Sequence, residues 1–110
     1  MIISYADDLA LIKKVVYKAG QIAKAAFLKD ELQIWDKGGG HQVTSADIAV
    51  NNYLSECLKK NRPKYGWLSE ETKDDRSRLK AKKTFVVDPI DGTKAFIDGT
   101  TDFVVSVAVI

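Results

Sequence analysis

The sequence predicts an α+β fold in which helices and short strands are interleaved along the chain. Segments 4–29 and 45–61 carry apolar residues at helical spacing, which predicts two long helices. Short apolar runs, several of them rich in β-branched residues, predict the strands. These runs lie at 32–35, 65–69, 84–88 and 103–110. The chain has 110 residues, which is enough for one modest domain.

Each long helix begins at a recognisable cap. Ser4 with Asp7, and Thr44 with Asp47, resemble capping boxes that carry Asp in place of the usual Glu. Pro63 ends the second helix, because its ring cannot continue the helical hydrogen bonds. The apolar stripes predict the buried faces. They comprise Leu9, Ile12, Val16, Ala19, Ala23, Ala26 and Phe27 in the first helix, and Ala46, Val50, Tyr53, Leu54, Cys57 and Leu58 in the second.

The remaining segments are expected to connect these elements. Residues 37–42 contain three glycines, which predicts a flexible loop. Residues 72–83 are highly charged and predict a solvated connection with room for one helical turn. A turn over 89–93 leads into a short helix. The two tryptophans, Trp35 and Trp67, are expected to be packing residues.

Composition excludes several classes of protein. The formal net charge of +2 is too small to argue for binding to a nucleic acid polymer. No apolar run of about 18 residues is present, so any membrane contact is expected to be peripheral at most. Cys57 is the single cysteine and cannot form an internal disulfide, so a reducing cytoplasm is the expected setting.

The last segment, 103–110, is an apolar strand without a polar tail. An unpaired strand of this kind is an aggregation hazard. We therefore expect the sequence to be the N-terminal part of a longer protein. The alternative is that this strand lies inside a sheet and the chain ends there.

Four acidic residues stand at the ends of predicted elements. Asp47 opens a helix, Glu70 follows a strand, Asp88 ends another strand and Asp91 lies in the turn after it. Such positions let a rigid scaffold present side chains to a shared cleft. Clustered carboxylates repel one another unless a cation lies among them, so a converged set would suit two or three divalent ions. Two such ions can clamp a phosphate ester and activate a water for in-line attack.

Each acidic residue also has a simpler interpretation. Asp47 can serve only as the capping-box acid, and its position alone favours this interpretation. Glu70 and Glu71 can be exposed loop charges. Asp91 can form a plain turn with the glycine that follows it, or cap the short helix. Asp88 is harder to assign to such a role, because an acid at the end of an apolar strand needs a partner.

The segment after the second aspartate suits an anion. The backbone N–H groups of Gly92 and Thr93 lie at the start of the short helix, where phosphate binds readily. The Thr93 hydroxyl either caps this helix or orients a metal-bound water. Lys37, the three glycines and His41 form either a mobile loop beside the site or a surface hairpin, which is the simpler interpretation for His41.

Together these motifs resemble the signature of the inositol monophosphatase superfamily. The matching segments are 43–47 (VTSAD), 67–71 (WLSEE) and 88–96 (DPIDGTKAF). The resemblance covers nearly the whole chain, but only the N-terminal part of a family member. It implies the layered α/β/α fold of these sugar phosphatases, cut short in this chain. The LSEE and GTKAF motifs are most similar to those of CysQ-type 3′(2′),5′-bisphosphate nucleotidases.

The resemblance also implies a metal site. Glu70 and Asp88, with the backbone carbonyl of Ile90, match ligands of a first Mg²⁺, and Asp88 and Asp91 match ligands of a second. Two or three ions are expected in all, with Li⁺ as an inhibitor.

The other matching positions imply the catalytic and substrate contacts. Asp47 and Thr93 resemble the pair that positions and activates the attacking water, and Gly92 and Thr93 resemble the phosphate-binding helix start. Glu71 matches a position near the site that is not a primary ligand, and Lys37 falls roughly at a loop lysine.

The implied activity is that of a Mg²⁺-dependent phosphomonoesterase that removes the 3′-phosphate of adenosine 3′,5′-bisphosphate and gives AMP and phosphate. One alternative is an inositol-1-phosphatase-like enzyme. The other is a catalytically inactive fragment, because the absent part of a family member supplies a further metal-binding aspartate and most substrate contacts. The expected partner is a small phosphorylated substrate, and the last strand leaves a homodimer open.

Overall fold

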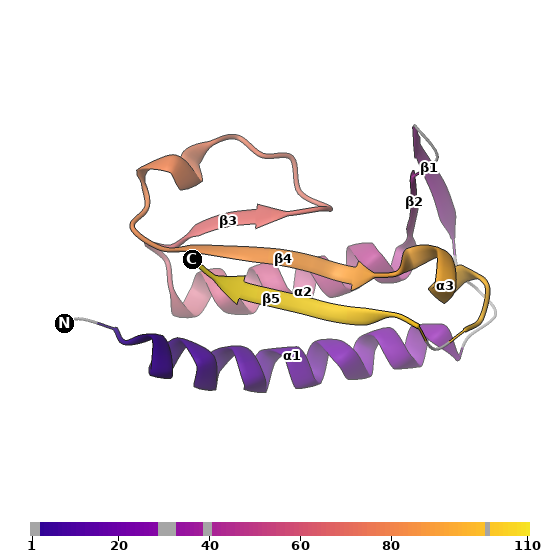
Figure 1. The fold of residues 1–110 in the computed structure, drawn as a ribbon, viewed down its shortest axis with the longest axis horizontal. Coiled ribbons are helices and arrows are strands. Elements are labelled where there is room, and N and C mark those ends of the chain that lie inside the picture. The colour runs from indigo at the N-terminus through magenta and orange to yellow at the C-terminus, as the bar shows by residue number, and fades with distance from the viewer. Residues whose placement is uncertain (1–2, 29–32, 39–40, 101) are drawn as a thin grey trace.

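Two helices cover one face of a three-stranded sheet (Figure 1). The structure is a computed structural model that describes residues 3–28, 33–38, 41–100 and 102–110. This arrangement confirms the predicted α+β class. In the described residues the elements are α1 (Tyr5–Phe27), β1 (Ile34–Gly38), β2 (His41–Thr44), α2 (Ser45–Asn61), β3 (Gly66–Ser69), the 3₁₀ helix η1 (Ser77–Lys80), β4 (Thr84–Asp91), α3 (Thr93–Ile97) and β5 (Val104–Val109).

The caps predicted from the sequence set the starts of both long helices. The Ser4 hydroxyl accepts a hydrogen bond from the backbone N–H of Asp7, whose carboxylate accepts from Ser4 in return. Thr44 and Asp47 form the same reciprocal box at the start of α2. Because each box satisfies backbone donors that the helix leaves free, it stabilises that helix end. The prediction of a helix over 45–61 is confirmed at both ends.

The sheet has β4 at its centre, parallel to β3 and antiparallel to β5. The carboxyl ends of parallel strands meet at the same edge of a sheet. The turn that follows β3 therefore lies beside the end of β4. In the described residues β5 is an edge strand that alternates between half-buried and exposed side chains.

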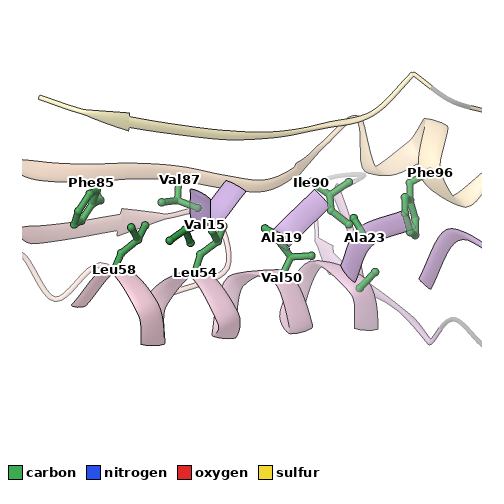
Figure 2. Packing of buried hydrophobic residues seen from close by; sticks show 11 residues of the cluster. Val15, Ala19, Ala23, Val50, Leu54, Leu58, Phe85, Val87, Ile90 and Phe96 are labelled. Carbon is green, nitrogen blue, oxygen red and sulfur yellow. The ribbon is translucent and has the colours of Figure 1, made fainter. Parts of the chain in front are cut away.

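The core lies between this sheet and the two helices (Figure 2). Small residues on α1, Ala19 and Ala23, let it approach α2 closely, because the distance between packed helices depends on the side chains at the contact. Leu54 and Leu58 are fully buried, and each contributes about 1.5–3 kcal/mol of hydrophobic stabilisation. The strands and α3 complete the core with Phe85, Val87, Ile90 and Phe96.

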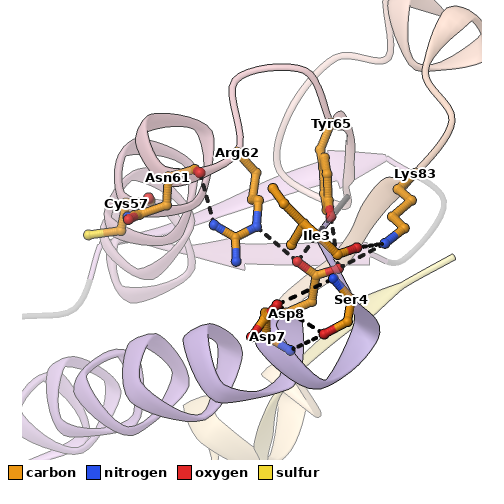
Figure 3. A network of polar contacts seen from close by, with 9 residues as sticks. All are labelled: Ile3, Ser4, Asp7, Asp8, Cys57, Asn61, Arg62, Tyr65 and Lys83. Atoms are coloured by element: carbon orange, nitrogen blue, oxygen red, sulfur yellow. Dashed lines mark hydrogen bonds and ion pairs between the residues drawn. The ribbon is translucent and has the colours of Figure 1, made fainter. Parts of the chain in front are cut away.

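A buried aspartate ties the start of α1 to the end of α2 (Figure 3). Asp8 accepts hydrogen bonds from Arg62 Nε at 2.9 Å and from the Tyr65 hydroxyl at 2.8 Å. Lys83, just before β4, lies 3.5 Å away. Burial raises the pKa of Asp8, but the bonds from Arg62 and Tyr65 and the charge of Lys83 outweigh it and hold the pKa below its usual value. This network therefore joins three parts of the fold.

Several local predictions were wrong. The expected loop over 37–42 takes part in an antiparallel hairpin of β1 and β2, although residues 39–40 lie outside the described residues. Strand β4 continues to Asp91, where a turn was expected. Leu9 and Trp35 are about half exposed, at 52% and 47%, because the elements that carry them leave those sides uncovered. In α1, Val15 is buried and Val16 is only half-buried.

Within the residues that the structure describes, no helix combines the length and the apolar character that a membrane crossing requires.

Candidate active site

A cleft of about 430 Å³ opens at the end of β4, between the β1–β2 hairpin, the turn after β3 and the start of α3. Every residue that the sequence proposed for the site lines this cleft, except Asp47. The lining residues from that set are Lys37, Glu70, Glu71, Asp88, Ile90, Asp91, Gly92 and Thr93. The folded chain thus brings together segments that lie more than fifty residues apart.

An irregularity in β4 lets both of its aspartates reach the cleft. Asp88 pairs with Ser106, whereas Asp91 pairs with Val104, so β4 has one residue more than β5 over this stretch. In a regular strand, residues three apart point to opposite faces of the sheet. The extra residue forms a bulge, and bulges re-aim side chains near functional sites. This explains how Asp88 and Asp91 come to line the same cleft.

Asp47 lies just behind the cleft and is 1% exposed. Its Oδ2 accepts hydrogen bonds from the Thr44 backbone N–H at 2.8 Å and from the Thr44 hydroxyl at 2.6 Å. Its Oδ1 lies 3.0 Å from the Thr93 hydroxyl, which donates to it or to the Ile90 carbonyl at 3.1 Å. The Asp47 carboxylate therefore caps α2 through one oxygen and contacts Thr93 through the other.

The glycine after the second aspartate is required by the backbone. Gly92 has φ of +92° and caps the start of α3. A Cβ on Gly92 would lie 2.5 Å from the Asp102 carbonyl oxygen. Neither Asp91 nor Thr93 forms a side-chain cap on this helix, so the simpler capping interpretation is wrong for both residues.

The carboxylates of the cleft repel one another. Burial, together with the negative charges of its neighbours, raises the pKa of Asp88 to about 6. Those neighbours are, in decreasing order of effect, Asp91, Glu70, Asp47 and Glu71. An opposite charge placed among these groups would lower that pKa and favour the charged form.

One ammonium group from the hairpin lies close to this negative charge. Lys37 Nζ lies 2.9 Å from Glu71 Oε1, and the Glu71 side chain is 6% exposed. Burial lowers the pKa of Lys37, but its bond to Glu71 and the charges of Glu70 and Asp47 hold it above its usual value. This ion pair joins β1 to the turn after β3.

The donor chemistry of the cleft fits Mg²⁺, which prefers carboxylate and carbonyl oxygens. Glu70, Asp88 and Asp91 offer carboxylates, and burial together with the negative charges of Asp91 and Glu70 disfavours the charged form of Asp88 when no cation is present. In the described ranges, no group of three or more His, Cys, Asp or Glu side chains is already arranged around a common point. The residues present therefore suit the ion chemically, whereas their carboxylates are not preassembled.

The cleft also includes residues that the sequence did not single out. Lys94 and Gln42 line it. His41, which the sequence placed in a loop beside the site or in a surface hairpin, lies in β2 and also lines the cleft. Lys94 directly follows Gly92 and Thr93, which the sequence proposed for phosphate binding, so its positive charge could have indicated a place at the site. Nothing in the sequence indicated that Gln42 lies at the site, because only the pairing of β1 with β2 brings it to the cleft.

Comparison with known proteins identifies a family and several relatives. The model of the inositol monophosphatase family matches residues 6–110. An inositol-1-monophosphatase of Rhizobium meliloti is 36% identical over 101 residues, which cover 91% of this chain and 38% of the relative. A 3′-phosphoadenosine 5′-phosphate phosphatase of Mycobacterium leprae is 42% identical over 65 residues, or 58% of this chain and 24% of the relative. The chain thus spans less than two-fifths of the length of these relatives.

The fold matches solved structures over the same part. An IMPase from Thermotoga maritima superposes with a TM-score of 0.83 at 25% sequence identity, covering 94% of this chain and 39% of that protein. The described residues therefore have the fold of the N-terminal portion of such enzymes.

Proposed function

Because this chain belongs to the inositol monophosphatase family, a family of metal-dependent phosphatases, we propose that it forms the metal- and phosphate-binding part of a Mg²⁺-dependent phosphomonoesterase. The observation that carries this proposal is the convergence of Glu70, Asp88 and Asp91 on one cleft, beside the Asp47–Thr93 pair.

Glu70, Asp88 and the Ile90 carbonyl are proposed to hold one Mg²⁺, with Asp88 and Asp91 holding a second. The bound cations would neutralise the carboxylates and polarise the phosphate ester, as metal ions do in two-metal phosphatases. Li⁺ is expected to inhibit by competing for these oxygens. Glu71 is proposed to stay outside the ligand set, because Lys37 already engages its carboxylate.

The Asp47–Thr93 pair is proposed to orient the attacking water. When the Thr93 hydroxyl donates its hydrogen bond to Asp47, the Thr93 oxygen can accept a hydrogen bond from water. The water oxygen would then attack phosphorus as the bond between phosphorus and the ester oxygen breaks. One proton of the water ends on the leaving alcohol oxygen and the other on the phosphate. Gly92 and Thr93 contribute backbone N–H groups to the phosphate oxygens.

Inositol 1-phosphate is the substrate that we favour. The supporting observation is the relative from Rhizobium meliloti, which bears the name inositol-1-monophosphatase and aligns with 91% of this chain. Adenosine 3′,5′-bisphosphate is the second candidate. It is supported by the GTKAF motif at 92–96 and by the relative from Mycobacterium leprae, although that alignment covers 58% of the chain.

Phosphate release from both substrates, with and without Mg²⁺, tests this proposal on the protein expressed from its own gene. We expect Mg²⁺-dependent release, faster from inositol 1-phosphate than from adenosine 3′,5′-bisphosphate. The reverse preference would support the second candidate. Mg²⁺ binding without turnover of either compound would support the inactive chain, and neither binding nor turnover would refute the phosphomonoesterase.

A further inference from the structure

A buried asparagine on α2 is bonded to both ends of the turn that carries Glu70 and Glu71. Asn51 is 5% exposed. Its Oδ1 accepts a hydrogen bond from the Ser69 hydroxyl at 2.5 Å, and its Nδ2 donates to Thr72 Oγ1 at 3.0 Å. Ser69 and Thr72 flank the two glutamates directly. A single amide group therefore holds the turn from both sides.

Further hydrogen bonds connect this amide to the backbone of the turn. Ser69 Oγ accepts from the Glu71 backbone N–H at 3.3 Å, and the Thr72 N–H donates to the Ser69 carbonyl at 3.3 Å. Thr72 Oγ1 also accepts from Trp67 Nε1 at 3.2 Å. Among the described residues that are not exposed, no buried side-chain nitrogen or oxygen lacks a partner. A fully satisfied buried network of this kind rigidifies its surroundings.

Local structure does not explain an asparagine at this position. Asparagine is a weak helix former, and its buried neighbours Val50 and Leu54 on α2 are apolar, whereas the buried Asp47 is used by the helix cap. A buried amide is costly unless it is hydrogen-bonded, and here both of its ends are bonded to one turn. Its contacts therefore point to the turn rather than to the helix.

We propose that Asn51 is a positioning residue that fixes the Glu70–Glu71 turn against α2 and so places its carboxylates at the cleft. The same helix carries Asp47 one turn earlier, so Asn51 holds the acidic turn in register with the Asp47–Thr93 pair. The identity of the cation rests on the function proposed above, whereas the positioning of the turn does not.

The test compares Asn51→Leu with Asn52→Leu, a matched control at an exposed position of the same helix. Leucine has a similar size but cannot form either hydrogen bond. Amide hydrogen exchange and Mg²⁺ titration calorimetry are measured on the whole chain. For Asn51→Leu we expect exchange at Glu71 and Thr72 to rise more than at β4, and the Mg²⁺ affinity to fall about tenfold, as when supporting groups of metal sites are removed. Asn52→Leu should change neither.

A second variant keeps the test decisive if Asn51→Leu does not fold. Asn51→Leu combined with Ser69→Ala removes the hydroxyl that would lose its acceptor at position 51, and it keeps Thr72 Oγ1 as the acceptor for Trp67 Nε1. Equal acceleration of exchange in the turn and β4 would overturn the proposal, and so would an unchanged Mg²⁺ affinity in a chain that does bind Mg²⁺. If the unsubstituted chain binds no Mg²⁺, the proposed function is refuted. Faster exchange that is confined to the turn in the variant would still support the positioning role of Asn51.

Discussion

The two carboxylate oxygens of Asp47 have different partners. The sequence offered two interpretations of this residue, a helix cap and a site residue, and the two sets of contacts are compatible with both. One oxygen caps α2 through Thr44, and the other lies against the Thr93 hydroxyl. The cap was predictable from the sequence because its partners are three residues apart. The contact with Thr93 spans 46 residues, and only the resemblance to a family anticipated it.

Asp88→Asn should separate folding from metal binding. In the metal-free chain the negative charge of Asp88 is disfavoured, since burial and neighbouring carboxylates raise its pKa to about 6. Removing the charge should stabilise the metal-free chain at pH 7, by about 1 kcal/mol after allowance for solvent screening. Urea unfolding measures the effect, with Asp98→Asn, an exposed position, as the control. A clear loss of stability would contradict the predicted repulsion.

Gly92→Ala should destabilise the fold more than Gly99→Ala. Both glycines have positive φ, which costs a residue with a side chain about 1–2 kcal/mol. Only at Gly92 would the new Cβ also meet backbone, the Asp102 carbonyl oxygen at 2.5 Å. We expect losses of roughly 1 kcal/mol for Gly99→Ala and at least about 2 kcal/mol for Gly92→Ala in thermal unfolding. Equal losses would show that the contact with Asp102 has no effect on stability.

At the scale of elements, the sequence predicted those features that depend on interactions between residues close to one another in the chain. The caps and Pro63 gave α2 its observed ends, and the charged segment 72–83 contains one 3₁₀ turn, η1. The bulge in β4 was not predictable, because it exists only relative to β5. The β1–β2 hairpin was only one of two interpretations of this segment, because its glycines favoured a loop. Asn51 gave no sequence signal, since its partners lie on another element.

The hairpin provides a test at this scale. Lys37→Met removes the ion pair with Glu71, which should speed hydrogen exchange in β1 and β2 with little loss of global stability, about 0.5 kcal/mol. It also removes a positive charge from the cleft, so the affinity for Mg²⁺ should rise severalfold. Lys18→Met, at an exposed position on α1, is the control. Unchanged exchange in the hairpin would show that the ion pair does not hold it.

At the scale of the whole molecule, hydrophobic periodicity predicted the class of fold, but it did not predict which apolar side chains are buried in every case. Ala19, Ala23 and Leu54 are buried as predicted, whereas Leu9 and Trp35 are exposed. Periodicity identifies the apolar face of an element, but only the tertiary arrangement decides how far that face extends. The network of Asp8 was also not predicted, because its partners are 54 or more residues away.

The Asp8 network should make stability depend on acid. Its pKa is held below the ordinary 3.8, so the stabilisation is fully present above that value and is lost as the pH falls through the folded-state pKa. Asp8→Ala leaves Arg62 without its buried partner and should cost about 3 kcal/mol at pH 7 in urea unfolding. The variant should also lose less further stability below pH 4 than the unsubstituted chain. An equal loss in both would exclude Asp8 as the source.

The proposal that the acidic cleft is a metal site can be tested by titration calorimetry. Mg²⁺ is titrated into the unsubstituted chain and into Asp88→Asn. Asp88 is proposed to contact both ions, so its loss should remove more affinity than the loss of any other single ligand. We expect saturable binding to the unsubstituted chain and a loss of at least about tenfold in affinity for Asp88→Asn. Equal Mg²⁺ affinity in the two proteins, or no binding to either, would contradict it.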